Sequence, residues 1–129
     1  MKRAVLHIGT EKTGTTSIQR FLLNNVQTLS DKGYLFPSSC EYLSNRNLVI
    51  YAKQDVPNGY LGSQLDFSDG KENWNSEFVS LHKKEVKEFQ ADGYVDPTVI
   101  YSSEHLQSRL TKKDEIVRVF EILLSLIHI

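Results

Sequence analysis

The feature that most constrains the fold is the stretch VLHIGTEKTGTTSIQRFLLNN, near the start of the chain. The apolar run Ala4 to Ile8 precedes a turn rich in glycine and threonine, and apolar residues at helical spacing follow that turn. A short apolar run without alternation is typical of a strand buried on both faces of a parallel sheet. The stretch therefore predicts a buried strand, a loop and a helix in direct succession.

The rest of the chain continues this alternation of strands and helices. Apolar spacing and turn residues predict a helix from Thr15 that ends at DKGY, a short strand in YLFPSS, a short helix in RNLVIYAK, an amphipathic helix around 78–89, a buried strand in TVIYSS and a final helix after TKKDE. This order predicts an α/β fold with an open, mostly parallel sheet and helices on its faces. In such folds ligands bind beyond the carboxyl ends of the strands.

The region Asp55 to Asn75 concentrates Gly, Pro, Asn, Asp and Ser among scattered aromatic residues. That composition predicts a long surface loop. Two interpretations stay open for it, a lid that faces a substrate and an ordinary variable excursion. On the helix that follows, Lys83, Lys84, Glu85, Lys87 and Glu88 predict a solvated face with mixed ion pairs.

Length and charge limit the classes of function. The chain has 129 residues, enough for one folding unit, and its net charge of −1 provides no global field toward nucleic acid or an anionic membrane. The single cysteine, Cys40, has no disulfide partner, and the N-terminus has too few apolar residues for a signal peptide or a membrane span. We therefore expect a cytoplasmic protein.

The last stretch, IVRVFEILLSLIHI, has none of the usual signals that stop a helix. This pattern leads us to expect a truncated domain, in which residues from about 124 to 129 form a non-native tail.

The loop after the first strand has the composition of an anion site. A strand that runs into a helix start presents unpaired backbone N–H groups and the positive end of the helix dipole to one point. Gly9 and Gly14 keep the four-residue gap of a nucleoside-triphosphate loop, but Thr15 follows directly where that loop has lysine, and the lysine is Lys12. A triphosphate site also needs Mg²⁺ and an aspartate after another strand, whereas the second buried strand ends in YSSEHL. The loop therefore predicts a phosphate-bearing donor that is bound without metal.

The stretch HIGTEKTGTTSIQRFL resembles the 5′-phosphosulfate-binding loop of sulfotransferases that use 3′-phosphoadenosine 5′-phosphosulfate. The resemblance implies a P-loop NTPase-like fold, no metal, and a chain that covers the N-terminal part of a single sulfotransferase-like domain. It assigns Lys12 to the leaving phosphate as a catalytic residue, and it implies that the donor is cradled by Gly9, Thr10, Lys12, Thr13, Gly14, Thr15, Thr16 and Ser17. The family's site for the donor's 3′-phosphate lies on later segments, so we expect this chain alone to bind donor weakly and to transfer little sulfate.

A second group of candidate residues follows the second buried strand. Glu104 in VIYSSEHL matches the place where many members of the superfamily carry the base that deprotonates the acceptor. Glu104 could equally cap the next helix, and His105 is the other candidate base, although an exposed helix histidine is the simpler interpretation. His7 is expected to be a packed or hydrogen-bonded histidine, and Arg20 and Arg109 to be surface residues.

Two other functions stay open. One is a Mg²⁺-dependent P-loop nucleotide kinase, and the other is a noncatalytic nucleotide-binding or interaction domain. For the sulfotransferase interpretation the partner is a small-molecule or carbohydrate acceptor, with neither nucleic acid nor membrane involved, and nothing in the sequence identifies that acceptor.

Overall fold

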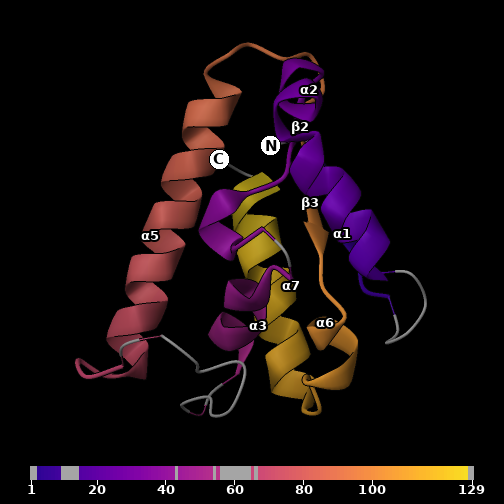
Figure 1. Ribbon diagram of the computed structural model, residues 1–129. Coiled ribbons are helices and arrows are strands. Elements are labelled where there is room, and N and C mark those ends of the chain that lie inside the picture. The colour runs from indigo at the N-terminus through magenta and orange to yellow at the C-terminus, as the bar shows by residue number, and fades with distance from the viewer. Residues whose placement is uncertain are drawn as a thin grey trace.

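The computed structural model describes residues 3–9, 15–42, 44–53, 55, 65 and 67–127. Its elements are β1 (Arg3–His7), α1 (Thr15–Asn24), α2 (Val26–Asp31), β2 (Tyr34–Leu35), the 3-10 turn η1 (Ser38–Cys40), α3 (Arg46–Ala52), α5 (Lys71–Gln90), β3 (Thr98–Ser102), α6 (His105–Ser108) and α7 (Lys113–Ile127). Figure 1 shows α1 and α5 on opposite sides of the molecule, with α3, α7 and β3 between them.

The strands form one open parallel sheet in the order β1-β3-β2. β3 is the central strand, and its register pairs Arg3 with Thr98 and His7 with Ser102. β2 pairs with the start of β3 through Tyr34 and Leu35. The predicted α/β class, with a parallel sheet and flanking helices, is therefore confirmed.

The predicted helix from Thr15 is two helices, α1 and α2, with a break at Asn25. The side-chain amide of Asn25 donates to the backbone oxygen of Phe21 at 2.7 Å, a local bond that competes with continuation of the helix. Gly33, at φ 91°, then ends this helical segment, in agreement with the prediction from DKGY.

The predicted loop Asp55 to Asn75 is too long at its end, because α5 already begins at Lys71. Gly70 precedes the helix at φ 94°, a conformation that favours glycine. In the first turn the ammonium of Lys71 donates to the Oδ1 of Asn75 at 2.6 Å and to the backbone oxygen of Lys53 at 2.9 Å. This side chain thus ties the start of α5 to the end of α3.

The core lies where α3, α5 and α7 meet the sheet. Leu48, Val49 and Ile50 of α3 are fully buried, as are Val99 and Tyr101 of β3. Each fully buried aliphatic side chain of this kind contributes about 1.5 to 3 kcal/mol. α3 contacts both α5 and α7, so it anchors the helical layer.

A line of polar side chains crosses this core from β3 to α5 and η1. The hydroxyl of Tyr101 lies 2.6 Å from the Nε2 of His82, and the Nδ1 of His82 lies 2.8 Å from the Oγ of Ser39. Ser39 donates from its Oγ to Glu85 at 2.5 Å. All these contacts are satisfied together when Tyr101 donates to Nε2, Nδ1–H donates to Ser39 and Ser39 donates to Glu85. The imidazole is completely buried and stacks on Phe78.

None of the helices that the structure describes combines the length and the apolar character needed to cross a membrane.

Candidate functional site

The carboxyl ends of β1 and β3 bring the two predicted site segments side by side. His7 and Ser102 are register partners at the last position of each strand, and the amide of Ser103 donates to the backbone oxygen of His7 at 3.0 Å. Gly9 and Glu104 therefore both lie two residues beyond a paired strand end. Figure 1 shows α6, which follows β3, at the same end of the molecule as the start of α1.

Ser102 makes hydrogen bonds to three other segments at this end of the sheet. Its hydroxyl lies 2.8 Å from the Nδ1 of His7, its backbone N–H donates to the Oδ1 of Asn45 at 2.6 Å, and its backbone oxygen accepts from Gln19 at 3.4 Å. The side chain is fully buried. Four different segments of the chain thus meet at one residue, and their relative positions are fixed by hydrogen bonds.

Glu104 is held by α1. The Nε2 of Gln19 donates to its Oε2 at 2.8 Å, and Gln19 is only 3% exposed. Glu104 stands at the N-cap position of α6, but its side chain makes no capping hydrogen bond there. The interaction with Gln19 instead orients the carboxylate toward the helix that follows the glycine and threonine loop.

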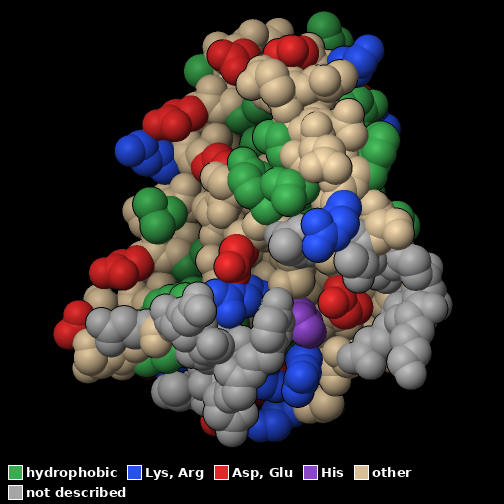
Figure 2. All heavy atoms as spheres, in the orientation of Figure 1, with side chains coloured by type: hydrophobic (Ala, Val, Ile, Leu, Met, Phe, Trp, Pro, Cys, Tyr) green, Lys and Arg blue, Asp and Glu red, His purple; other side chains and the backbone are tan. Residues whose placement is uncertain are grey.

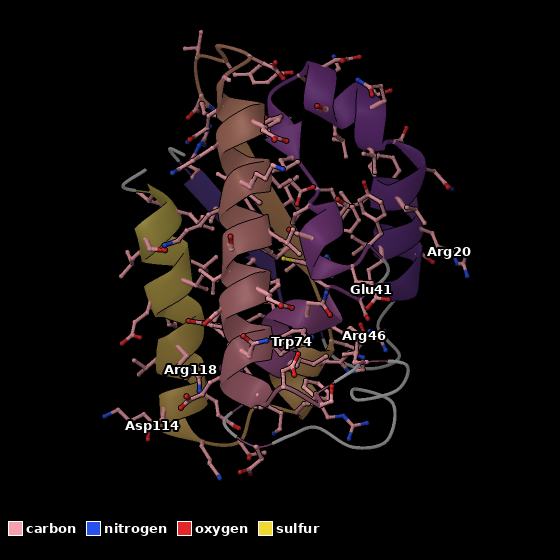
Figure 3. The ribbon with its side chains drawn as sticks, turned by 90° about the vertical axis from the view of Figure 1, so that its left-hand side faces the viewer. Arg20, Glu41, Arg46, Trp74, Asp114 and Arg118 are labelled. Atoms are coloured by element: carbon pink, nitrogen blue, oxygen red, sulfur yellow. The ribbon has the colours of Figure 1, made fainter. Side chains whose placement is uncertain are left out.

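Asn45 connects the site to the turn before α3. It is fully buried and has a left-handed backbone at φ 44° and ψ 39°, a conformation that asparagine tolerates better than most residues. Its Nδ2 donates to the backbone oxygen of Glu41 at 2.7 Å. An ion pair between Arg46 and Glu41 closes the same turn, and Figure 3 shows these two side chains near each other.

Replacing Asn45 with Ala is expected to lower the free energy of unfolding by about 1 to 3 kcal/mol, because it leaves the buried N–H of Ser102 unpaired. Asn45→Gly loses the same bond but keeps the left-handed backbone relaxed, so it should cost less than Asn45→Ala. Urea unfolding measures both values, with Asn73→Ala on the exposed face of α5 as the matched control. Equal stability of Asn45→Ala and the control variant would show that this bond is not needed.

Only part of the predicted donor cradle can be placed. Gly9, two residues after the end of β1, has φ 59°, a left-handed conformation that favours glycine. Ser17 is exposed in the first turn of α1. Thr10, Lys12, Thr13 and Gly14 lie outside the described residues. Thr15 and Thr16 begin α1, and their side chains also lie outside what the structure describes.

The other residues singled out from the sequence have mixed outcomes. His7 is hydrogen-bonded as predicted, and Arg20 and Arg109 are exposed as predicted; Figure 3 shows Arg20 at the outer edge of the molecule. The interpretation of His105 as an exposed helix histidine is wrong, because only 8% of it is exposed. His105 and Leu106 are the buried residues of α6, and the backbone N–H of His105 donates to the Oγ of Ser103 at 3.2 Å.

Charges of both signs meet at this end of the molecule. On the lower half of the face in Figure 2, Lys and Arg side chains lie close to acidic side chains and a histidine. Within the described ranges, no three His, Cys, Asp or Glu side chains form a group that could hold a metal ion. The described part of the site thus offers a carboxylate fixed by an amide, a serine and histidine pair, and a glycine turn leading toward a helix start.

Two residues of the site, Gln19 and Asn45, were not predicted from the sequence.

No family model, curated protein or solved structure matches this chain. A proposal about its function therefore depends on the residues of the site and their contacts.

Proposed function

We propose that the protein transfers a sulfuryl group from 3′-phosphoadenosine 5′-phosphosulfate to a hydroxyl or amine acceptor, on a P-loop NTPase-like fold. The observation that carries the proposal is the adjacency of the two strand ends, where Glu104 stands across from the turn at Gly9. The loop sequence supports the donor assignment, because Lys12 and the Gly-Thr-Thr helix start resemble a phosphosulfate-binding loop.

The proposed reaction uses two groups on opposite sides of the transferred sulfur. Glu104 accepts the proton from the acceptor while the acceptor oxygen or nitrogen forms its bond to sulfur. The bond from sulfur to the bridging oxygen of the donor breaks, and adenosine 3′,5′-bisphosphate leaves with the electron pair. Lys12 and the backbone amides of the loop stabilise the negative charge that grows on the leaving phosphate.

Donor binding is the direct test of the loop assignment. The protein that carries this sequence should bind adenosine 3′,5′-bisphosphate more tightly than ATP with Mg²⁺, as measured by calorimetric titration. Tighter binding of ATP with Mg²⁺ would favour the nucleotide kinase. Bisphosphate binding without sulfate transfer to any acceptor in a hydroxyl and amine panel would favour the noncatalytic domain.

Lys12→Ala is expected to weaken bisphosphate binding by about 10-fold or more, because a charge-assisted hydrogen bond contributes about 1.5 to 3 kcal/mol. The same titration provides the measurement. Lys32→Ala is the matched control, since Lys32 is exposed beyond the end of α2. Unchanged affinity in Lys12→Ala would remove that lysine from the donor site.

A further inference from the structure

Two hollows adjoin along α5, away from the strand ends that form the candidate site. The first has a volume of about 570 Å³ and lies among α3, α5 and α7; its lining includes Tyr51, Asn75, Ser80 and Arg118. The second, of about 440 Å³, has all its described lining residues on α5 and shares Ser80 with the first. Figure 3 shows Arg118 on the lower half of α7, beside α5. We call the two hollows together the α5 groove.

The α5 groove is long enough for an extended ligand. Its lining on α5 runs from Glu72 to Glu88, and at 1.5 Å per residue this corresponds to about 24 Å. A small metabolite would occupy only one of the two hollows.

The basic side chains of the α5 groove form no ion pairs with acidic residues in the described part of the chain. Among the residues that the structure describes, no ion pair within 4.0 Å involves Lys83, Lys84, Lys87 or Arg118. The prediction of mixed ion pairs on this helix is therefore wrong for the described residues, and Glu85 instead accepts hydrogen bonds from Ser38 and Ser39. These cations remain available to an anionic ligand.

Arg118 is held ready to bind a planar anion. Its guanidinium lies over the ring of Tyr51, with 5.1 Å from Cζ to the ring centroid. Stacking on a ring leaves the N–H groups at the edge of the guanidinium, where they can bind a carboxylate through two parallel bonds. Burial, and to a smaller extent the positive charge of Arg118, lower the pKa of Lys71 to about 8.

The remaining polar lining suits a ligand that also donates hydrogen bonds. Asn75, Ser76 and Ser80 are uncharged donors and acceptors, and the carboxylates of Glu72 and Glu88 are acceptors only. A ligand with anionic groups alone would leave Glu72 facing like charge. A ligand that carries both carboxylates and hydroxyl groups complements the cations and the acceptors together.

We propose that the α5 groove binds an extended acidic carbohydrate, a chain of sugars that carry carboxylate groups. Carboxylates pair with Arg118 and the lysines, and sugar hydroxyls donate to Glu72 and Asn75. A nucleic acid fits less well, since its charge lies on phosphates and each internal nucleotide offers at most one free hydroxyl group, and the side chains of an acidic peptide carry carboxylates without hydroxyl groups. The proposal concerns a site separate from the donor loop and does not depend on sulfuryl transfer.

The test is a titration of the full chain with four oligomers of matched length: oligogalacturonate, a neutral glucan, oligoglutamate and oligouridylate. Backbone NMR shifts report where each one binds. Oligogalacturonate is expected to shift the amides of α5 around Ser76 to Lys87 and to bind at least about 10-fold more tightly than the others. Equal or tighter binding of oligoglutamate or oligouridylate, or no shift in α5 with any oligomer, overturns the proposal.

Variants separate this site from the donor site. Lys83→Gln with Lys87→Gln should weaken oligogalacturonate binding by about 10-fold, and Arg118→Lys should weaken it by about 3-fold or more although the charge is kept. Lys32→Gln, outside the groove, should change it less than about 2-fold. None of these variants should alter affinity for adenosine 3′,5′-bisphosphate. Equal weakening by Lys32→Gln and the double variant contradicts a defined site and indicates general charge attraction.

Discussion

Glu104→Gln is expected to reduce the rate of sulfuryl transfer by about 10²- to 10⁴-fold in the protein that carries this sequence, the range typical for loss of a positioned general base. The change is nearly isosteric, and it removes the negative charge together with the ability to accept a proton. Gln19 can still lie against the new amide, since one of its two polar atoms remains an oxygen at hydrogen-bond distance. The measurement is the initial rate of adenosine 3′,5′-bisphosphate release at saturating donor and acceptor.

The affinity for bisphosphate should change less than about 2-fold in Glu104→Gln, because the role assigned to Glu104 is toward the acceptor. Glu121→Gln is the matched control, an exposed carboxylate on α7. A rate within about 5-fold of the unaltered protein would show that Glu104 is not the base, and His105 would not replace it easily, since this histidine is buried.

The order of elements and the parallel sheet follow from local patterns in the sequence. The apolar runs before Gly9 and before Ser102 are each contained within a few residues, and parallel strands joined by helices have few possible arrangements. The residues at which helices begin and end could not be predicted in the same way. The end of α1 depends on which partner the Asn25 side chain takes, and the start of α5 on the contact between Lys71 and the end of α3.

For the site, the strand ends could be predicted but their supporting residues could not. Glu104 follows a recognisable buried strand, whereas Gln19 is 85 positions away from it and Asn45 is 57 positions from Ser102. A signal for Gln19 did exist, because it lies three residues before Leu22 and so shares the buried face of α1. Asn45 has no such signal, since a left-handed asparagine before a helix is visible only once the backbone is known.

The burial of His82 was not predicted from the sequence either, and it affects the stability of the protein in acid. A histidine in a helix rich in lysine and glutamate is expected to be exposed. His82 is instead completely buried, and its ring lies among Phe78, Ser39, Cys40 and Tyr101. Burial lowers the pKa of His82 to about 4, against the opposing charge of Glu85, which raises it. The ordinary value in an unfolded chain is about 6.5.

We expect the protein to lose stability as the pH falls from about 6.5 to about 4. In that window the unfolded chain takes up a proton at His82 and the folded chain does not, so acid favours unfolding. The interval between the two pKa values, at about 1.4 kcal/mol per pH unit, makes the loss about 3 kcal/mol. Urea unfolding at steps of half a pH unit measures it.

The contribution of His82 can be separated from that of Glu85. Burial acts to raise the pKa of Glu85, but the hydrogen bonds from Ser39 and Ser38 outweigh this effect and leave it below its usual value, so its contribution is lost only at more acid pH. The glutamine of His82→Gln cannot titrate. Between pH 6.5 and 4.5 the free energy of unfolding of this variant should therefore change less with pH than that of the unaltered protein, even though the variant is less stable overall. The imidazole resonances of the unaltered protein provide a second measurement that needs no variant. If they report a charged His82 at pH 5.5 in the folded state, the assignment of a neutral imidazole between Tyr101 and Ser39 is wrong, and the loss of stability in acid has another origin.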